Sequence, residues 1–134
     1  MKIQIATDYA IRILQYLHLN PSGVHTASAI SQTIGVSYPF FIKICNQLKK
    51  AGLVHTVQGR NGGYALGRPA DKISFYDVFS AIEGEMQISH CIRAEDQHCN
   101  RGALDTCRLR GFLCNVQKTV IHEMSQKSLA DLVH

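Results

Sequence analysis

Two short helical patterns separated by a glycine limit most strongly what this chain can fold into. The first covers residues 26–34 and starts at Thr26, whose hydroxyl can accept a hydrogen bond at a helix start. Gly35 follows, and glycine ends a helix at low cost because it adopts left-handed backbone angles. The second pattern starts after Ser37 and tolerates Pro39 in its first turn. Its apolar face is formed by Phe41, Ile44, Cys45 and Leu48, which we expect in the core. Two such helices joined by a short turn are typical of a helix-turn-helix.

A β-hairpin is predicted directly after these helices. Residues 53–57 and 64–66 are rich in β-prone side chains, and the glycine-rich stretch 58–63 joins them. A hairpin in this place is the wing of a winged helix-turn-helix, and Arg60 at its tip suits a minor groove or a phosphate. The alternative is an exposed hairpin with an incidental arginine. The order of helix, turn, helix and basic hairpin favours the wing.

The second helix and the hairpin supply the residues expected to contact double-stranded DNA. On the helix face opposite the core, apolar groups could read a thymine methyl group. Lys49 and Lys50 would add a salt-sensitive attraction to phosphate. The full predicted DNA-binding set is Thr26, Ser28, Ser37, Tyr38, Pro39, Ile42, Lys43, Asn46, Arg60, Asn61 and Gly62.

Charge is distributed unevenly along the chain. Residues 1–68 hold seven Lys or Arg and one Asp, a net charge of +6. Residues 69–134 hold seven Lys or Arg and nine Asp or Glu, a net charge of −2. Such asymmetry is typical of a protein whose basic half meets nucleic acid or another anion, and also of an ordinary solvated basic face.

Three further helices are predicted around this unit. Residues 6–19 form the first, with Thr7 as its capping residue. Residues 73–82 form the second, capped by Ser74. The third covers about 106–126, and its apolar stripe is Leu109, Phe112, Leu113, Val116, Val120, Ile121 and Met124.

This last helix is predicted to form a homodimer. A chain this small need not bury so long a stripe internally, and dimers on DNA match the two-fold symmetry of operators. Cys114 lies on the same helix and is expected to pack at that interface. The alternative is a helix packed on its own domain. Residues 128–133 would follow as a short docked tail.

Three cysteines recur at an even interval, C-x7-C-x7-C, at Cys91, Cys99 and Cys107. The residues between them are polar or charged and show no apolar period, so a loop is predicted. Thiolates there suit zinc, cuprous copper or an iron–sulfur cluster, and unconnected buried cysteines are the alternative. His90 and His98 adjoin cysteines and keep zinc open, although the tight C-x2-C spacing of structural zinc sites is missing.

Composition restricts location and class. No run of about 18 apolar residues could span a membrane, and no signal-peptide pattern opens the chain, so a cytoplasmic protein is predicted. Five cysteines, an odd number, argue against a disulfide framework. No nucleophile–base pair or phosphate loop indicates an enzyme. A small iron–sulfur electron carrier is an alternative hypothesis, but a helix-turn-helix with a basic wing has no use in electron transfer.

The chain resembles the Rrf2 family of bacterial winged-helix regulators, whose members include IscR-like and NsrR-like proteins. The resemblance rests on the three cysteines and on residues 7–10, 30–31, 35–37, 48–54, 59–66, 74–84 and 128–132, and it covers essentially the whole chain. It implies a homodimeric DNA-binding regulator that is not an enzyme. It also implies an iron–sulfur cluster that senses iron, redox state or nitric oxide.

The resemblance further implies a ligand set. Cys91, Cys99 and Cys107 would hold the cluster, and 4Fe–4S is expected rather than 2Fe–2S. IscR-like members use a His three residues after the third cysteine, where this chain has Arg110, which has no free lone pair for a metal. NsrR-like members use an Asp of the first helix, supplied by the partner subunit, and Asp8 stands at that position. A carboxylate on the helix dipole is the alternative role of Asp8. The x7 gaps are longer than the x5 spacing common in the family.

The sequence therefore predicts a mainly α protein with a two-stranded β wing and a long C-terminal dimerisation helix. Its parts would be a DNA-binding domain at 1–84, a cluster loop at 85–108 and a dimerisation helix with tail at 109–134. The predicted function is transcriptional regulation through an iron–sulfur cluster. A cluster-free thiol/disulfide redox switch on the same fold is the alternative.

Overall fold

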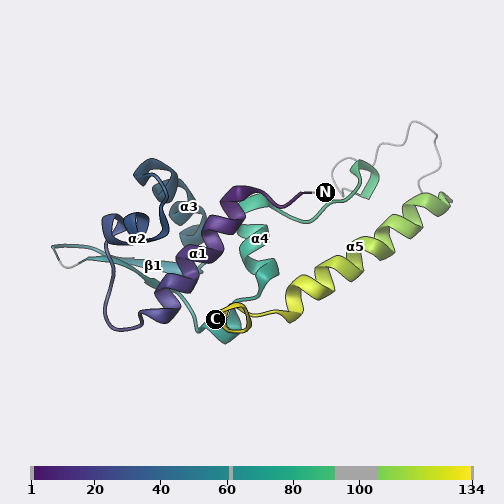
Figure 1. Cartoon of the computed structure of the whole chain (residues 1–134). Helices are drawn as coiled ribbons and strands as arrows, with labels where there is room; N and C mark the ends of the chain where they lie inside the picture. Colours follow the sequence, from purple (N-terminus) through teal and green to yellow (C-terminus); the bar gives the residue numbers. More distant parts are fainter. Residues whose placement is uncertain (1, 61, 93–105, 134) are drawn as a thin grey trace.

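The computed structural model describes residues 2–60, 62–92 and 106–133, in which helices dominate around one pair of strands (Figure 1). The longer elements are α1 (Ile5–Leu19), α2 (Ala27–Ile34), α3 (Tyr38–Lys50), β1 (Val54–Val57), β2 (Gly63–Leu66), α4 (Phe75–Glu83) and α5 (Arg108–Gln126). Three short 3-10 turns are η1 (Ala70–Lys72), η2 (His90–Ile92) and η3 (Ala130–Leu132). The predicted mainly helical fold with a two-stranded sheet is confirmed.

The core lies where α1, α3 and α4 meet, and α2 and the strands close its sides. The apolar face predicted for α3 is fully buried, including Cys45. From α1 it meets Ile13 and Leu14, and from α4 it meets Val78. Burying one such side chain contributes about 1.5–3 kcal/mol, so this contact among three helices holds α3 in place.

The turn between α2 and α3 has the geometry expected from sequence. Gly35 adopts a positive φ of 74°, and the Thr26 hydroxyl accepts a hydrogen bond from the amide of Ala29 at 3.1 Å. Ser37 precedes α3 in extended conformation, as predicted, but its side chain makes no capping bond. Pro39 explains this, because it removes one of the amide donors that a capping side chain normally uses.

The wing is an antiparallel pair in which Val54 faces Leu66 and Val57 faces Gly63. It is also joined to the segment before α2. The Tyr64 amide donates to the His25 carbonyl at 2.8 Å, and the His25 amide donates back to the Tyr64 carbonyl at 3.2 Å. A Cβ atom at Gly63 would lie 2.2 Å from the His25 carbonyl oxygen, so only glycine fits there. The wing is therefore fixed to the helix-turn-helix.

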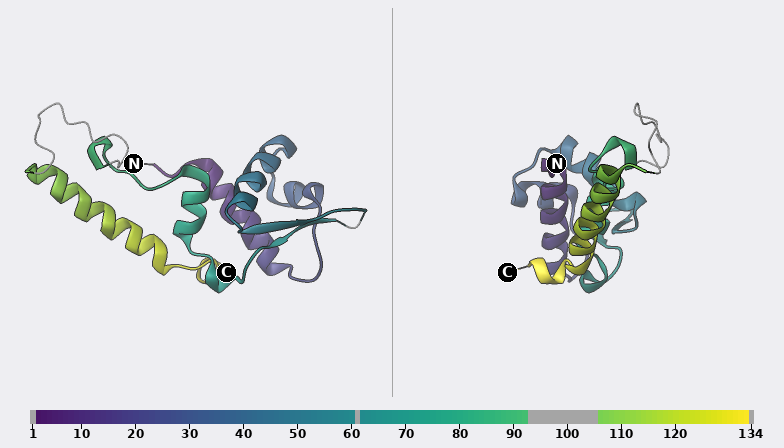
Figure 2. Two further views of the ribbon diagram at one scale, coloured as in Figure 1. Left: turned by 180° about the vertical axis from the view of Figure 1, so that it is seen from behind. Right: turned by 90° about the vertical axis from the view of Figure 1, so that its right-hand side faces the viewer.

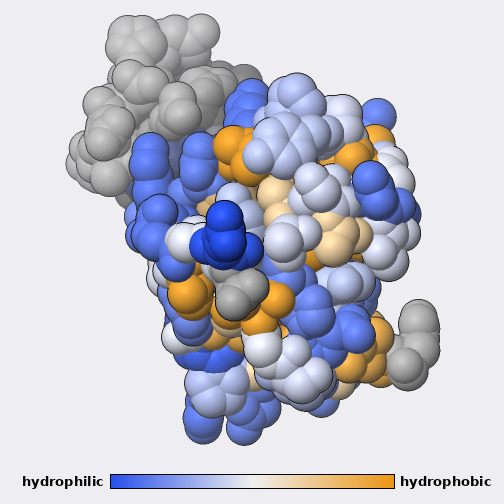
Figure 3. Space-filling view, turned by 90° about the vertical axis from the view of Figure 1, so that its left-hand side faces the viewer, coloured by the Kyte–Doolittle hydropathy of each residue, from blue (hydrophilic) through white to orange (hydrophobic). Residues whose placement is uncertain are grey.

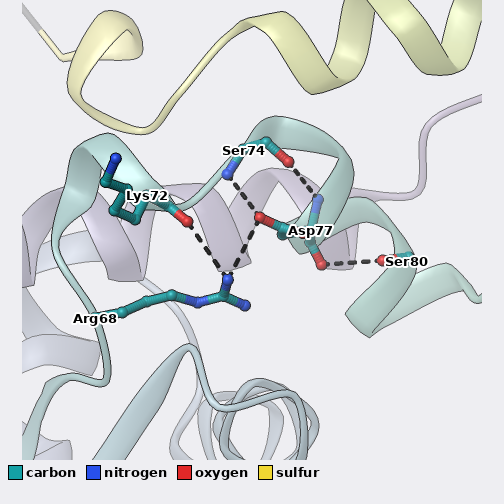
Figure 4. A network of polar contacts seen from close by, with 5 residues as sticks. All are labelled: Arg68, Lys72, Ser74, Asp77 and Ser80. Carbon is teal, nitrogen blue, oxygen red and sulfur yellow. Dashed lines mark hydrogen bonds and ion pairs between the residues drawn. The ribbon is translucent and has the colours of Figure 1, made fainter.

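A compact polar network starts α4 (Figure 4). The Ser74 hydroxyl accepts from the Asp77 amide at 3.0 Å, and Asp77 Oδ2 accepts from the Ser74 amide at 2.9 Å. Arg68 approaches the same carboxylate at 3.9 Å and donates to the Lys72 carbonyl at 3.4 Å, while Ser80 donates to the Asp77 carbonyl. Ser74 is thus confirmed as the cap of this helix.

The tail, residues 127–132, bonds to the segment that leads into α4. The Leu129 amide donates to the Ile73 carbonyl at 2.7 Å, and the Phe75 amide donates to the Lys127 carbonyl at 2.8 Å. Leu129 is only 1% exposed and belongs to the core. The docked tail predicted from sequence is confirmed, and it anchors the C-terminal end of α5 to the winged-helix domain.

The start of α1 differs from the prediction. The helix begins at Ile5 with Gln4 as its capping position, so Thr7 is not the cap. Thr7 is fully buried, and its hydroxyl donates to Glu83 Oε2 at 2.5 Å. The Gln4 amide donates to the same carboxylate at 3.2 Å. Glu83 therefore ties the first turn of α1 to the end of α4, a long-range partner that local sequence did not reveal.

Helix α5 lies to one side of the molecule, with α4 between it and α1 (Figures 1 and 2). It contacts α4 and η2, but none of its residues is buried. Leu109 is 55% exposed and Phe112 is 62% exposed. Among the described helices, none has the length and apolar content needed to cross a bilayer.

Candidate DNA interface and cysteine site

Helix α3 presents most of its predicted DNA-contacting residues at the surface. Ser37, Tyr38, Pro39, Lys43 and Asn46 are all exposed, because the opposite face is held in the core. Figure 3 views the end of the molecule from which the wing projects, and its surface is largely hydrophilic with small apolar patches.

Ile42 departs from this pattern. It is half-buried and packs against the core, so only part of its side chain remains available to a base. The helix face opposite the core is thus narrower than the sequence suggested. Thr26 and Ser28, at the start of α2, are exposed, although the Thr26 hydroxyl is already occupied in capping.

A groove of about 380 Å³ lies between α3 and the wing. Tyr38, Asn46 and Lys49 line its α3 side, and Thr56 and Gly59 line its wing side. Two elements separated in sequence therefore offer one continuous polar surface. Burial raises the pKa of the Tyr64 hydroxyl, which also lines the groove, so that this phenol stays protonated.

The wing tip carries Arg60, which is exposed. Asn61 lies outside the described residues. Gly62 is needed by the turn, since a Cβ atom there would lie 2.0 Å from the Val57 carbonyl oxygen. We therefore assign Gly62 a structural role in shaping the tip.

The basic side chains of this surface are not consumed by ion pairs. Lys43, Lys49, Lys50 and Arg60 are exposed, and the ion pairs of the described part of the chain join other residues. Their charge therefore stays available to an anionic partner.

The cysteine site is described at both of its ends. Cys91 lies in η2, half-exposed, with its Sγ 3.1 Å from the hydroxyl oxygen of Ser89. Cys107 is the N-cap of α5, and its Sγ accepts from the backbone amide of Arg110 at 3.5 Å. Both are free thiols. Cys99 lies outside the described residues.

Arg110 contacts both described cysteines. Its backbone amide donates a hydrogen bond to Cys107 Sγ, and its guanidinium Nε donates to the backbone carbonyl of Cys91 at 3.1 Å. Sequence reasoning treated Arg110 only as a residue that cannot bind a metal. The contact spans 19 positions, and no local pattern could have indicated it.

Asp8 lies in the first turn of α1 with its side chain 52% exposed. Its carboxylate pairs with Arg12 at 2.9 Å, one helical turn away. Within the described ranges of one protomer, no three candidate ligands come together as a metal site. The predicted contribution of Asp8 across a dimer thus stays a prediction.

The other cysteines and histidines have simpler positions. Cys45 lies in the core, as predicted. Burial raises its pKa to about 12, so this thiol stays protonated. Cys114 is half-exposed on α5. His90 begins η2, and His98 lies outside the described residues.

Known proteins with the same architecture are winged-helix transcription regulators. The structure of CymR, the global cysteine regulator of B. subtilis, is 25% identical, with a TM-score of 0.76 over 98% of this chain and 95% of that one. T. potens IscR is 23% identical, with a TM-score of 0.74 over 98% of this chain and 85% of its own. The oxidised form of Staphylococcus aureus CymR is 21% identical, with a TM-score of 0.72 over 100% and 97%.

The fold and the basic surface define a winged-helix DNA-binding regulator, not an enzyme. Residues 3–134 match the Rrf2 family, described as iron-dependent transcriptional regulators. Protein aau3 of Rhizobium meliloti (strain 1021) is 34% identical over 133 residues, which are 99% of this chain and 85% of that protein. The chain belongs to the Rrf2 family, and the predicted resemblance is confirmed.

Proposed function

We propose that this Rrf2-family regulator is a homodimer that controls transcription through an iron–sulfur cluster bound by its cysteine segment, residues 91–107. One observation carries the proposal. Cys91 and Cys107, far apart in sequence, both contact Arg110 at the N-terminal end of α5. Two cysteines, whose thiolates are soft ligands, thus lie near one residue of a helix that has no buried residue of its own.

The donor chemistry fits such a cluster. Cys91 and Cys107 are unoxidised thiols at the protein surface, and Cys99 would supply the third sulfur. Asp8 is accessible, and its ion pair with Arg12 is an exposed one that costs little to break. We propose Asp8 of the partner subunit as the fourth ligand of a 4Fe–4S cluster. When bound, the cluster would supply sensitivity to iron supply, oxygen or nitric oxide.

The homodimer is proposed from α5. Its apolar stripe runs along the whole helix, and Phe112 and Leu109 are more than half exposed. Large apolar side chains exposed together on one helix face are typical of an interface. Pairing of two α5 helices would place two winged-helix domains on either side of a two-fold axis, as a palindromic operator requires.

The proposed reading surface comprises α3 and the wing. Tyr38 and Asn46 would meet base edges in the major groove, Arg60 would enter the minor groove, and Lys43 would contact phosphate. Within the domain Glu83 joins α1 to α4, and the tail joins the C-terminal end of α5 to the segment before α4. A structural change at the cysteine site would therefore alter the distance between the two α3 helices of the dimer. This coupling between the cysteine site and the DNA-binding surface is the proposed regulatory step.

Anaerobic purification followed by iron and sulfide counts and an ultraviolet–visible spectrum tests the cluster. Wild type should bind about four irons and four sulfides per protomer, as expected for a thiolate-held 4Fe–4S centre. Cys91→Ser should lose them, whereas Cys114→Ser should keep them. A colourless protein after reconstitution with iron and sulfide would contradict the proposal.

The fourth ligand needs its own comparison. Asp8→Ala should lower cluster retention under air, and Asp71→Ala, which removes another exposed carboxylate, should not. Equal cluster yield and lifetime in both variants would exclude Asp8.

A second candidate function is a thiol/disulfide switch without a cluster. Likeness to a CymR structure described as oxidised favours it, and so does the contact of one residue, Arg110, with two cysteines whose thiols are free. DNA affinity would then follow thiol oxidation and ignore iron. Thiol trapping in air and in reductant, paired with fluorescence anisotropy on duplex DNA, separates the two functions.

A further inference from the structure

We propose that the Arg110 side chain is a clasp that holds Cys91 close to Cys107 before any cofactor binds. This role rests on the proposed function, since the position of Cys91 relative to Cys107 matters only when the two thiols act together. Arg110 itself touches no metal in this scheme and acts through the cysteines it positions.

The two bonds of Arg110 come from different parts of the residue. Its backbone amide donates to Cys107 Sγ at 3.5 Å, which any residue at this position of the helix could do. Its side-chain Nε donates to the Cys91 carbonyl oxygen at 3.1 Å, which depends on the arginine itself. Substitution therefore removes one tie and leaves the other.

The side-chain hydrogen bond joins Cys91 to α5, whereas the other side-chain contact of Cys91 is with its neighbour Ser89. Cys107 is held by the start of α5, whereas Cys91 sits in the short turn η2. A bond between Gln117 Oε1 and the Ile88 amide, at 3.2 Å, also attaches this region to α5. Of these two hydrogen bonds to α5, the Arg110 bond is the one that reaches a cysteine, so it sets where Cys91 lies relative to Cys107.

Arginine suits the role for a physical reason. Its planar guanidinium presents donors in a fixed fork, so little conformational freedom is lost when one bond forms. Arg110 is half-buried, which shields the bond from water. The chain thus carries, three residues after Cys107, a residue that organises ligands instead of binding a metal.

A cross-linking reaction on cofactor-free protein measures directly whether the Cys91 and Cys107 thiols lie close together. In the full chain carrying Cys99→Ser and Cys114→Ser, the surface cysteines left in the described ranges are Cys91 and Cys107. Cys45 stays, because its burial and its pKa of about 12 keep it unreactive. Bismaleimidoethane adds each thiol across one maleimide double bond. A chain whose two thiols lie close together gains one reagent molecule as a bridge, and a chain whose thiols lie apart gains two.

Arg110→Gln and Arg110→Met should lower the ratio of bridged to doubly modified chain about tenfold, as expected for loss of one charge-assisted hydrogen bond. Both replacements are good helix formers, so α5 is retained, and circular dichroism verifies this. Arg108→Gln is the matched control, since it removes an equal charge from an exposed position of the same turn. Ratios in both Arg110 variants equal to that of the control would overturn the clasp.

Cluster yield of the otherwise unmodified chain separates this proposal from the function on which it rests. A wild-type protein that never binds iron, together with a lowered bridging ratio in Arg110 variants, would leave the clasp standing and remove the iron–sulfur function. A full cluster with an unchanged bridging ratio would remove the clasp alone.

Discussion

The winged-helix domain and α5 are held in place in opposite ways. Within the domain, α1 and α3 bury whole apolar faces, and side chains such as Phe41 and Ile44 are fully enclosed. Helix α5 is longer than either, yet it buries none of its residues. One region encloses its apolar side chains, and the other leaves Leu109 and Phe112 more than half exposed.

This contrast separates stability from regulation. Core contacts fix the geometry of the DNA-reading surface, so that surface is expected to be the same in every regulatory state. Helix α5 buries none of its residues, and elements of low local stability are those that can move when a signal arrives. Substitutions in the two regions should therefore differ in their cost to the free energy of unfolding.

The largest loss is expected for Phe41→Ala. Phe41 is fully buried on α3, and truncation of such a side chain leaves a cavity that costs about 4 kcal/mol. Urea unfolding followed by circular dichroism measures the change. A loss below about 1 kcal/mol would contradict the assignment of this face to the core.

Leu129→Ala should cost somewhat less, about 3 kcal/mol, because Leu129 of the tail enters the same core. The informative control is Leu109→Ala on the exposed stripe of α5. Equal losses in both would mean that the tail is not part of the domain.

Ser74→Ala should remove about 1 kcal/mol, the usual contribution of a capping hydroxyl. Ser37→Ala gives the comparison, because the Ser37 side chain makes no capping bond. Thermal melts should rank Ser74→Ala clearly below Ser37→Ala, and the reverse order would refute the capping assignments.

Phe112→Asp should change the stability of the protomer by less than about 0.5 kcal/mol, since the side chain is largely exposed. It should, however, convert a dimer into a monomer of 14.9 kDa in sedimentation equilibrium. Lys118→Asp places the same charge on another exposed face of α5 and should stay dimeric. A monomeric wild type would end the dimer proposal.

The smallest effect concerns pH. Hydrogen bonds from the Ser128 amide and hydroxyl lower the pKa of Asp131 below its ordinary value of 3.8. The folded state then binds fewer protons than the unfolded state, so the stabilisation is full above about pH 4 and is lost as the pH falls further. Asp131→Asn should flatten the dependence of stability on pH in that range.

Local patterns predicted the elements of this fold, and long-range contacts escaped them. The buried face of α3, the Gly35 turn and the cap at Ser74 follow from residue spacing and from backbone preferences, which nearby sequence encodes. Thr7 was misassigned because its partner, Glu83, lies 76 positions away.

The candidate site divides in the same way. The exposed row on α3 could be predicted from helix periodicity, except that Ile42 turns partly toward the core. Cys91 and Cys107 were identified from their spacing, but their common contact with Arg110 was not, because a side chain to carbonyl bond leaves no mark in sequence.

The hydrogen bonds between the tail and the segment before α4 hold the C-terminal end of α5, so that α5 could rotate about this end as a rigid rod. Its 19 residues extend about 28 Å from that anchored end at 1.5 Å per residue. A displacement of about 2 Å at Cys107 would then need a rotation of only about 4°, a motion that packed helices readily accommodate. A reaction at a few sulfur atoms could in this way change the angle between α5 and the start of α4.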